Sequence, residues 1–250
     1  MVYLRDPSEI DRIREAAQVV GRTLKMLREH VRPGVTTAEL DRIAEAYIRS
    51  QGAEPAFKGY RGFPASICPS VNEQVVHAIP GGATLKEGDI ISIDVGARKN
   101  CYYGDAATTY PVGAIDDEAR KLLEVTRDSL AAGIAQARPG NRVGDIGHAV
   151  QAVAEANGFS VVRTLVGHGI GREMHEEPQV PNYGPPARGP RLLAGQVIAI
   201  EPMVNIGGPD VVTSKDGWTV VTRDGLRSAH FEHTVAIGPD GPEILSQVED

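Results

Sequence analysis

The segment VRPGVTTAELDRIAEAYIRSQGA (residues 31–53) has a second copy in ARPGNRVGDIGHAVQAVAEANG (residues 137–158). The two copies align without a gap from the Arg-Pro-Gly turn to the glycine near the end. Between these landmarks apolar residues recur at helical spacing, so each copy predicts an amphipathic helix that begins at a polar cap and is closed by its glycine. The expected caps are Thr36 or Thr37 in the first copy and Asn141 in the second.

The repeat extends on both sides of these helices. A further helix is expected before each copy, over residues 8–30 and 116–136. After each copy comes a short apolar strand that ends in an acidic residue, Asp94 in the first half and Glu201 in the second. Two helix–strand units could look alike by chance, but a gapless match over this many landmarks favours duplication.

We therefore predict an α+β fold that forms one domain over residues 1–250. Its pseudo-repeats cover approximately residues 8–110 and 116–237. Two such halves would share one cleft lined by strands, and a chain of this length can bury a core of its own without disulfides.

The composition excludes several classes of protein. A formal net charge of −7 argues against a dedicated binder of nucleic acid or anionic membranes. The two cysteines, Cys68 and Cys101, are too few for a disulfide framework. No apolar run is long enough for a signal peptide or a membrane span. We expect a reducing, cytoplasmic setting.

Two aspartates are expected on paired strands. In the strand predicted over residues 89–97, Asp94 alternates with aliphatic residues and so faces away from them. A two-residue turn at Lys99-Asn100 would place Asp94 directly opposite Asp105, with Cβ atoms about 5 Å apart. Like charges so close repel unless a cation lies between them or one takes a proton. The alternative is a register shifted by two residues, with both acids on a solvated rim.

The second half supplies a corresponding pair. Glu201 closes the strand over residues 197–200, and Glu232 lies within an alternating segment over residues 229–235. Either glutamate alone would more often be a charge on an edge strand. Two pairs in equivalent positions of a duplicated fold suit two divalent cations about 3.5–4 Å apart.

Histidines flank these acids in the sequence. His168 lies between two glycines, and His175 follows in the same loop. Together with four carboxylates they favour a metal ligand and an acid–base or oxyanion partner. For His77, which lies in an apolar run, the residues alone favour a satisfied core histidine. Structural or surface roles are assigned to the others, His30, His148, His230 and His233.

Long motifs along nearly the whole chain resemble those of the bacterial type I methionine aminopeptidases. They are YRGFPASICPSVNEQVVHAIP (60–80), DIISIDVGA (89–97), YYGDAATT (102–109), GHGIGREMHEEPQV (167–180), IAIEPM (198–203) and DGWTVVT with SAHFEHTV (216–222 and 228–235). That family has the pita-bread fold, in which two pseudo-symmetric halves pack helices on an antiparallel sheet around one catalytic cleft. The repeat agrees with this architecture.

The resemblance implies the roles of particular residues. The implied metal ligands are Asp94, Asp105, His168, Glu201 and Glu232. Glu201, His77 and His175 are implied to be catalytic, so the resemblance replaces the reading of His77 as a core residue. The implied substrate-binding residues are His77, His175, Tyr60, Phe63, Cys68, Met174 and Trp218, with Phe57 at the edge of the methionine pocket. Departures from the family pattern fall on Phe57, Arg61, Phe63, Glu173 and Met174, and they bear on pocket detail rather than on the reaction.

The implied activity is removal of the N-terminal methionine from nascent proteins when the second residue is small. Two divalent ions, Co, Mn, Fe or Zn, would assist the hydrolysis. A monovalent cation near Ser92 and Ser228, transient association with the ribosome and a monomeric state are further expectations, with no nucleic-acid or membrane partner. The alternatives are an Xaa-Pro aminopeptidase or prolidase, which usually carries an extra N-terminal domain, and a non-catalytic binding protein of the same fold, which would lose ligands.

Overall fold

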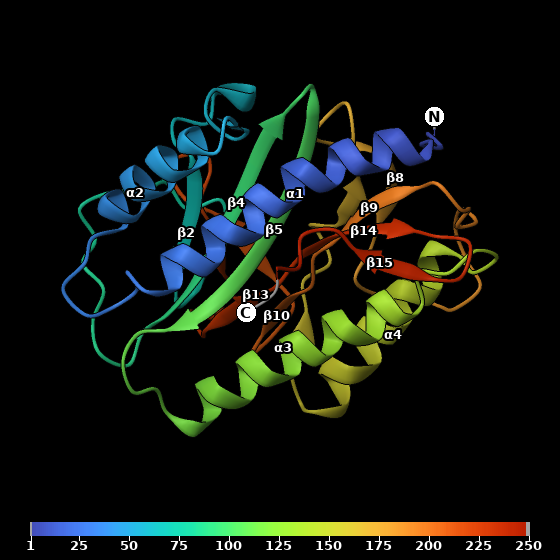
Figure 1. The fold of residues 1–250 in the computed structure, drawn as a ribbon. Coiled ribbons are helices and arrows are strands. Elements are labelled where there is room, and N and C mark those ends of the chain that lie inside the picture. Colours follow the sequence, from blue (N-terminus) through green and yellow to red (C-terminus); the bar gives the residue numbers. More distant parts are fainter. Residues whose placement is uncertain (1, 249–250) are drawn as a thin grey trace.

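The computed structural model describes residues 2–248, and its four α-helices come in two pairs. The first pair is α1 (Pro7–Arg28) with α2 (Thr37–Ser50), and the second is α3 (Asp117–Ala135) with α4 (Val143–Ala156). In Figure 1 helix α1 crosses in front of β4 and β5, and the second pair lies lower in the view. The long helices therefore occur where the repeat predicts them.

The strands of the described chain form four sheets. The first half contributes β4 with β1, β2 and β5, and a five-stranded sheet in the second half has the order β15-β14-β9-β7-β8. Two three-stranded sheets have the orders β13-β10-β6 and β11-β12-β3. The bounds are β1 Glu54–Pro55, β2 Ile67–Val71, β3 Gln74–Val76, β4 Ile90–Lys99, β5 Tyr102–Pro111, β6 Ser160–Val161, β7 Gly167–Gly169, β8 Glu176–Val180, β9 Val197–Ile200, β10 Met203–Asn205, β11 Val211–Thr213, β12 Val220–Thr222, β13 Ser228–His230, β14 His233–Ile237 and β15 Pro242–Ile244.

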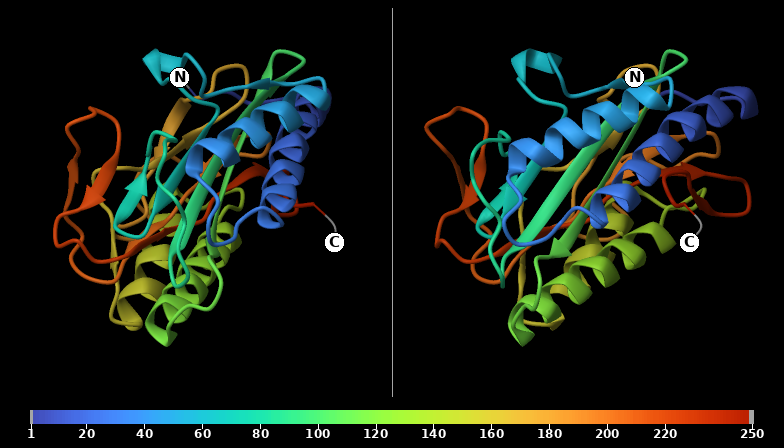
Figure 2. Two further views of the ribbon diagram at one scale, coloured as in Figure 1. Left: turned by 90° about the vertical axis from the view of Figure 1, so that its left-hand side faces the viewer. Right: turned by 60° about the vertical axis from the view of Figure 1, so that its left-hand side comes forward.

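Each helix pair covers its own apolar core. Helix α1 packs on β4 and β5, whereas α3 packs on β9, β10 and β13. Ile91, Ile93 and Val95 of β4 are buried in the cluster beneath α1 and α2. A second cluster lies beneath α3 and α4. The turned views in Figure 2 show the helices on the outside of the strands. Since side chains alternate along β4, Asp94 points to the face away from the helices.

Strand β5 joins the two halves. The Glu232 N–H donates to the Ala107 carbonyl at 2.9 Å. Thr109 of β5 bonds the backbone of His230, and Thr234 of β14 bonds the backbone of Asp105. Acidic residues far apart in the sequence are thereby fixed next to one another.

The predicted helix caps are confirmed for one helix and wrong for the other. The Thr36 hydroxyl accepts from the Glu39 N–H at 3.2 Å and begins α2. The cap position before α4 is occupied by Arg142 instead, whose N–H donates to the Asp145 carboxylate at 2.7 Å. The Asn141 side chain points elsewhere, and its amide nitrogen donates to the Gln136 carbonyl at 2.9 Å.

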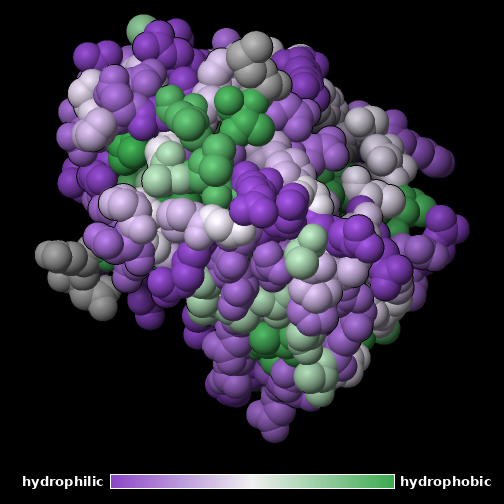
Figure 3. All heavy atoms as spheres, turned by 90° about the vertical axis from the view of Figure 1, so that its right-hand side faces the viewer, coloured by the Kyte–Doolittle hydropathy of each residue, from purple (hydrophilic) through white to green (hydrophobic). Residues whose placement is uncertain are grey.

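The face shown in Figure 3 is hydrophilic over most of its area, with apolar atoms gathered in small patches. Within residues 2–248, no helix combines the length and apolar character that a membrane span requires.

Candidate metal centre and substrate pocket

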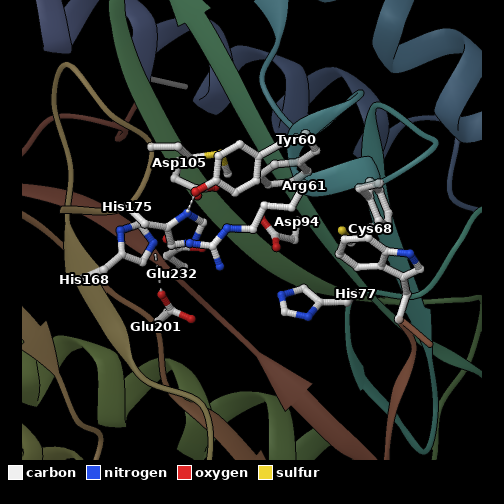
Figure 4. Close-up of a pocket in the computed structure, with 14 residues that line it drawn as sticks. Tyr60, Arg61, Cys68, His77, Asp94, Asp105, His168, His175, Glu201 and Glu232 are labelled. Atoms are coloured by element: carbon white, nitrogen blue, oxygen red, sulfur yellow. Dashed lines mark hydrogen bonds and ion pairs between the residues drawn. The ribbon is translucent and has the colours of Figure 1, made fainter. Parts of the chain in front are cut away.

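One cavity of about 140 Å³ collects every site residue expected from the sequence. Carboxylates and histidines form one part of its lining, and aromatic and sulfur-containing side chains form another (Figure 4). Both halves of the chain contribute. The lining residues are Phe57, Tyr60, Arg61, Phe63, Cys68, His77, Asp94, Asp105, His168, Met174, His175, Glu201, Trp218 and Glu232.

Asp94 and Asp105 lie on adjacent strands but are not direct partners. Asp94 pairs with Ala107, and Asp105 pairs with Gly96, so the predicted register is wrong by two residues. The turn consists of Asn100 and Cys101, both with positive φ (51° and 67°), instead of Lys99-Asn100. The two aspartates are diagonal neighbours on one face, and both are buried rather than on a solvated rim.

The glutamates come from the second half. Glu201 directly follows β9, and Glu232 stands between β13 and β14. The backbone bonds between Glu232 and Ala107 bring the Glu232 side chain to the face that carries Asp105. The second half thus supplies carboxylates to the same cavity as the first.

The fold holds the four carboxyl groups close together despite the repulsion between their negative charges. Burial raises the pKa of Asp94 to about 7. Burial also raises the pKa of Asp105 well above its usual range, and the charges of Glu232 and Asp94 raise it further. Burial and the neighbouring carboxylates have the same effect on the pKa of Glu201 and of Glu232. Oxygens of Asp94, Asp105 and Glu232 are buried without a hydrogen-bond partner among the described residues.

Such a set of oxygens fits divalent cations. Burying unpaired carboxylates is costly, and a bound cation removes both the repulsion and the lack of partners. Ligand atoms of Asp105, His168 and Glu232 lie within 4.8 Å of one another. The donor set of carboxylate oxygens and one imidazole is compatible with Mn, Fe, Co or Zn.

The backbone around His168 orients its ring. Nδ1 lies 2.8 Å from the Gly169 carbonyl, which can only accept, so Nδ1 carries the proton and Nε2 keeps a free lone pair. Nε2 lies 3.5 Å from Oε1 of Glu201. Burial lowers the pKa of His168 to about 4, so the ring is neutral near pH 7. A neutral imidazole with a free Nε2 is the form that binds metals.

The glycines beside His168 allow a close approach of backbones. A Cβ on Gly167 would lie 2.4 Å from the Ala199 carbonyl oxygen, and one on Gly169 would lie 2.3 Å from the Glu177 carbonyl oxygen. Strands β8 and β9 therefore pack directly against β7 and fix the position of His168.

His175 and His77 stand on other sides of the cavity. The Tyr60 hydroxyl lies 2.9 Å from Nδ1 of His175, and the two rings stack with centroids 5.3 Å apart. Enclosure, with smaller effects of His168 and Arg61, lowers the pKa of His175 to about 3. His77 has a positive φ of 59°, and burial lowers its pKa. It lines the cavity rather than the apolar core.

The apolar part of the cavity suits a linear thioether side chain. Phe57, Phe63, Cys68 and Met174 form a buried cluster against which Tyr60 and Trp218 pack. The rings of Phe63 and Trp218 meet edge to face at 5.2 Å. Sulfur atoms make favourable contacts with aromatic edges, so these walls match a methionine side chain.

Sequence reasoning missed one buried residue beside the acids. His230 is 2% exposed, and neither ring nitrogen has a hydrogen-bond partner among the described residues. Its Nε2 lies 4.0 Å from Oε2 of Glu232. Its spacing of two from Glu232 in a segment with strand-like alternation was the available signal. His233 is instead structural, since Nδ1 contacts the Ser246 hydroxyl at 2.8 Å.

The expected monovalent site stays a prediction. The Ser92 hydroxyl bonds the Thr109 hydroxyl, and the Ser228 hydroxyl donates to the Val204 carbonyl at 3.3 Å.

Fold and site together define a two-half α+β protein with a buried carboxylate and histidine cluster beside an apolar pocket. The model of metallopeptidase family M24 matches residues 11–239, and the chain belongs to this family.

Individual relatives agree with this assignment. Methionine aminopeptidase 1 of Bacillus subtilis is 56% identical over 248 residues, which cover 99% of this chain and 100% of that protein. The methionine aminopeptidase of Clostridium perfringens is 57% identical over 249 residues, which cover 100% of both chains. The crystal structure of methionine aminopeptidase from Rickettsia prowazekii superimposes with a TM-score of 0.98 at 42% identity, covering 99% of this chain and 100% of that one.

Prolidases share the fold at a greater distance. The prolidase from Pyrococcus furiosus superimposes with a TM-score of 0.81 at 22% identity and covers 99% of this chain but 66% of its own. This likeness concerns the fold alone. The α+β pita-bread fold is confirmed, and neither the prolidase nor the binding-protein alternative is favoured.

Proposed function

We propose that this metallopeptidase removes the N-terminal methionine from polypeptides whose second residue is small. The observation that carries the proposal is one cavity in which three buried carboxylates, partly buried Glu201 and the free Nε2 of His168 meet a pocket of aromatic and sulfur-containing walls. The relatives named methionine aminopeptidase match this chain over nearly its whole length.

The residues that would hold two divalent cations are Asp94, Asp105, His168, Glu201 and Glu232. Buried oxygens without partners and raised carboxyl pKa values support this set. Bound divalent cations lower the pKa of an attacking water toward neutrality and polarise the scissile carbonyl.

The chain's own groups would move the protons. A carboxylate of Glu201 accepts the proton of the attacking water and passes it to the leaving amine. With the Tyr60 hydroxyl as donor to Nδ1, the neutral His175 ring carries its proton on Nε2. That N–H donates to the scissile carbonyl oxygen and stabilises the developing negative charge. His77 contacts the scissile amide near its nitrogen.

The apolar pocket would select the first residue of the substrate. The limited volume of the cavity would select a small second residue. The side chain of the first residue lies among Phe63, Cys68, Met174 and Trp218 and excludes water there. The cavity of about 140 Å³ leaves little room for a bulky second side chain.

We further propose one catalytic domain over residues 1–250, a monomer that works in the cytoplasm on nascent chains. The free thiols of buried Cys68 and exposed Cys101 suit a reducing compartment. Transient association with the ribosome belongs to the same proposal.

Methionine release tests the activity. Chelator-treated protein is supplied with single metals and with peptides of the form Met-Ala-X-X, Met-Leu-X-X and Xaa-Pro-X. We expect metal-dependent release from Met-Ala peptides alone. Cleavage of Xaa-Pro peptides would place the chain with the prolidases, and no release with any metal would refute the proposal. Asp105→Asn should abolish release, because it removes a carboxylate that both halves hold in the cavity.

A further inference from the structure

Arg61 places a cation at the edge of the cavity. It lies in the short 3₁₀ turn over Tyr60–Gly62, where its φ of 50° is unusual for a long side chain. Figure 4 shows its guanidinium extending over the cavity toward His175. The side chain is exposed and lies over the Tyr60 ring at 5.3 Å.

No carboxylate neutralises this guanidinium. Across residues 2–248, no acidic oxygen lies within ion-pair distance of Arg61, although fourteen residues crowd the same cavity. The adjacent Glu176 is engaged by Arg5, and both side chains are 5% exposed. The cationic charge is therefore available to a ligand.

Arg61 also borders a second hollow. This hollow has a volume of about 370 Å³ and shares Arg61, His168 and His175 with the first cavity. Its remaining lining is Val166, Gly167, Glu176, Glu177 and Gln179. Hollow and cavity therefore meet at the residues that would surround the scissile bond.

The path of a substrate follows from these positions. The methionine side chain fills the aromatic part of the cavity, and the scissile bond lies at the carboxylates. The rest of the peptide must then leave through an open side, and the adjoining hollow offers one. A chain that leaves there passes Arg61 just after its small second residue.

We propose that Arg61 forms a subsite for a carboxylate side chain on the third residue of the substrate. This inference rests on the proposed function and deepens it. The aspartate or glutamate of the substrate pairs with the guanidinium at the junction of the two hollows. Exposed Glu177 lies in the same hollow, so the preference comes from this one guanidinium and not from a uniformly cationic surface.

Three matched peptides test the subsite: Met-Ala-Asp-Ala-Ala, its Asn isostere and its Lys counterpart. The quantity measured is the ratio of kcat/KM for the Asp peptide to that for the Asn peptide, which cancels any general loss of activity. We expect a ratio of about two to five at low salt, as for an exposed ion pair. The ratio should approach one in about 1 M salt, where the charges are screened. The Lys peptide should be the slowest.

Variants separate Arg61 from the overall charge. Arg61→Gln should bring the ratio to one, and Arg61→Lys should keep part of it. Arg120→Gln on α3 changes the net charge equally but lies away from the cavity, and it should keep the full ratio. A ratio of one in the wild type, or an undiminished ratio in Arg61→Gln, would overturn the subsite while leaving methionine release intact. If none of the three peptides is cleaved, the proposed function is overturned as well.

Discussion

The Thr234 side chain exchanges two hydrogen bonds with the backbone of Asp105. The Asp105 N–H donates to Oγ1 of Thr234 at 3.0 Å, and the Thr234 hydroxyl donates to the Asp105 carbonyl at 2.7 Å. Thr109 of the first half makes the same pair of bonds to His230 of the second, at 2.9 and 2.8 Å. The two halves thus clamp each other by reciprocal threonines, and each clamp lies beside an acidic residue of the cavity.

Replacing Thr234 by valine should loosen this junction. The change keeps the side-chain shape but leaves a buried N–H and a buried carbonyl of Asp105 without that partner, so the free energy of unfolding should fall by about 2–4 kcal/mol. Urea unfolding of the metal-free protein measures it. Thr234→Ser keeps the hydroxyl and should lose about 1 kcal/mol. Equal losses in both variants would show that packing, not the hydrogen bonds, holds Asp105.

The metal-free protein should become less stable as the pH rises above 6.5. Carboxyl groups with raised pKa values in the folded state stabilise it at low pH, and this contribution is lost as the pH rises toward those values, about 7 for Asp94. The buried histidines, with lowered pKa values, act in the opposite sense below pH 6.5, where the unfolded chain still binds protons. As the pH rises further, the histidines of the unfolded chain lose their protons and this opposing effect fades.

Denaturant titrations between pH 6.5 and 8 in the presence of a chelator measure this effect. One proton taken up on folding corresponds to a slope of about 1.4 kcal/mol per pH unit. Saturating Mn²⁺ should reverse the slope, because cations compete with protons for the same oxygens. Asp94→Asn should make the slope of the metal-free protein shallower. A stability independent of pH in the absence of metal would contradict the prediction.

The helices of this fold could be predicted because their information is local. Amphipathic spacing and closing glycines predict the bounds of α1 to α4 to within about two residues. The exception in detail is the cap of α4, which is Arg142 instead of Asn141. The register between β4 and β5 could not be predicted, because it depends on a turn with positive φ at both Asn100 and Cys101. Asparagine favours that conformation, but cysteine carries no such signal.

The sequence could indicate which residues line the cavity, but it could not predict their geometry. The convergence of Asp105 and Glu232 depends on backbone bonds between Ala107 and Glu232, which no sequence period encodes. The burial of His230 goes with a neighbouring long-range contact, the bond from the Thr109 hydroxyl to the His230 carbonyl. The roles of these residues stay predictions.

The substitution Gly169→Ala should displace the His168 side chain. The added Cβ would lie 2.3 Å from the Glu177 carbonyl oxygen, so one of the two backbones must move. Because the Gly169 carbonyl also holds Nδ1 of His168, the affinity for Mn²⁺ should fall about tenfold to a hundredfold. Calorimetric titration of the metal-free protein measures it. Gly82→Ala is the control, since a Cβ there meets nothing within 4 Å, and an equal affinity in both variants would refute the prediction.

The Tyr60→Phe variant should distinguish the contribution of the Tyr60 hydroxyl to activity from that of the Tyr60 ring. The variant keeps the stacking on His175, with centroids 5.3 Å apart, but removes the hydroxyl 2.9 Å from Nδ1. Without that donor the ring no longer favours the form with its proton on Nε2, so kcat for Met-Ala-Ala-Ala should fall about threefold to tenfold, whereas KM should change little because the apolar wall remains. Tyr47→Phe on α2 is the control and should keep both constants. If Tyr60→Phe raises KM and keeps kcat, then Tyr60 acts only as a wall of the methionine pocket, and His175 must be oriented by another group.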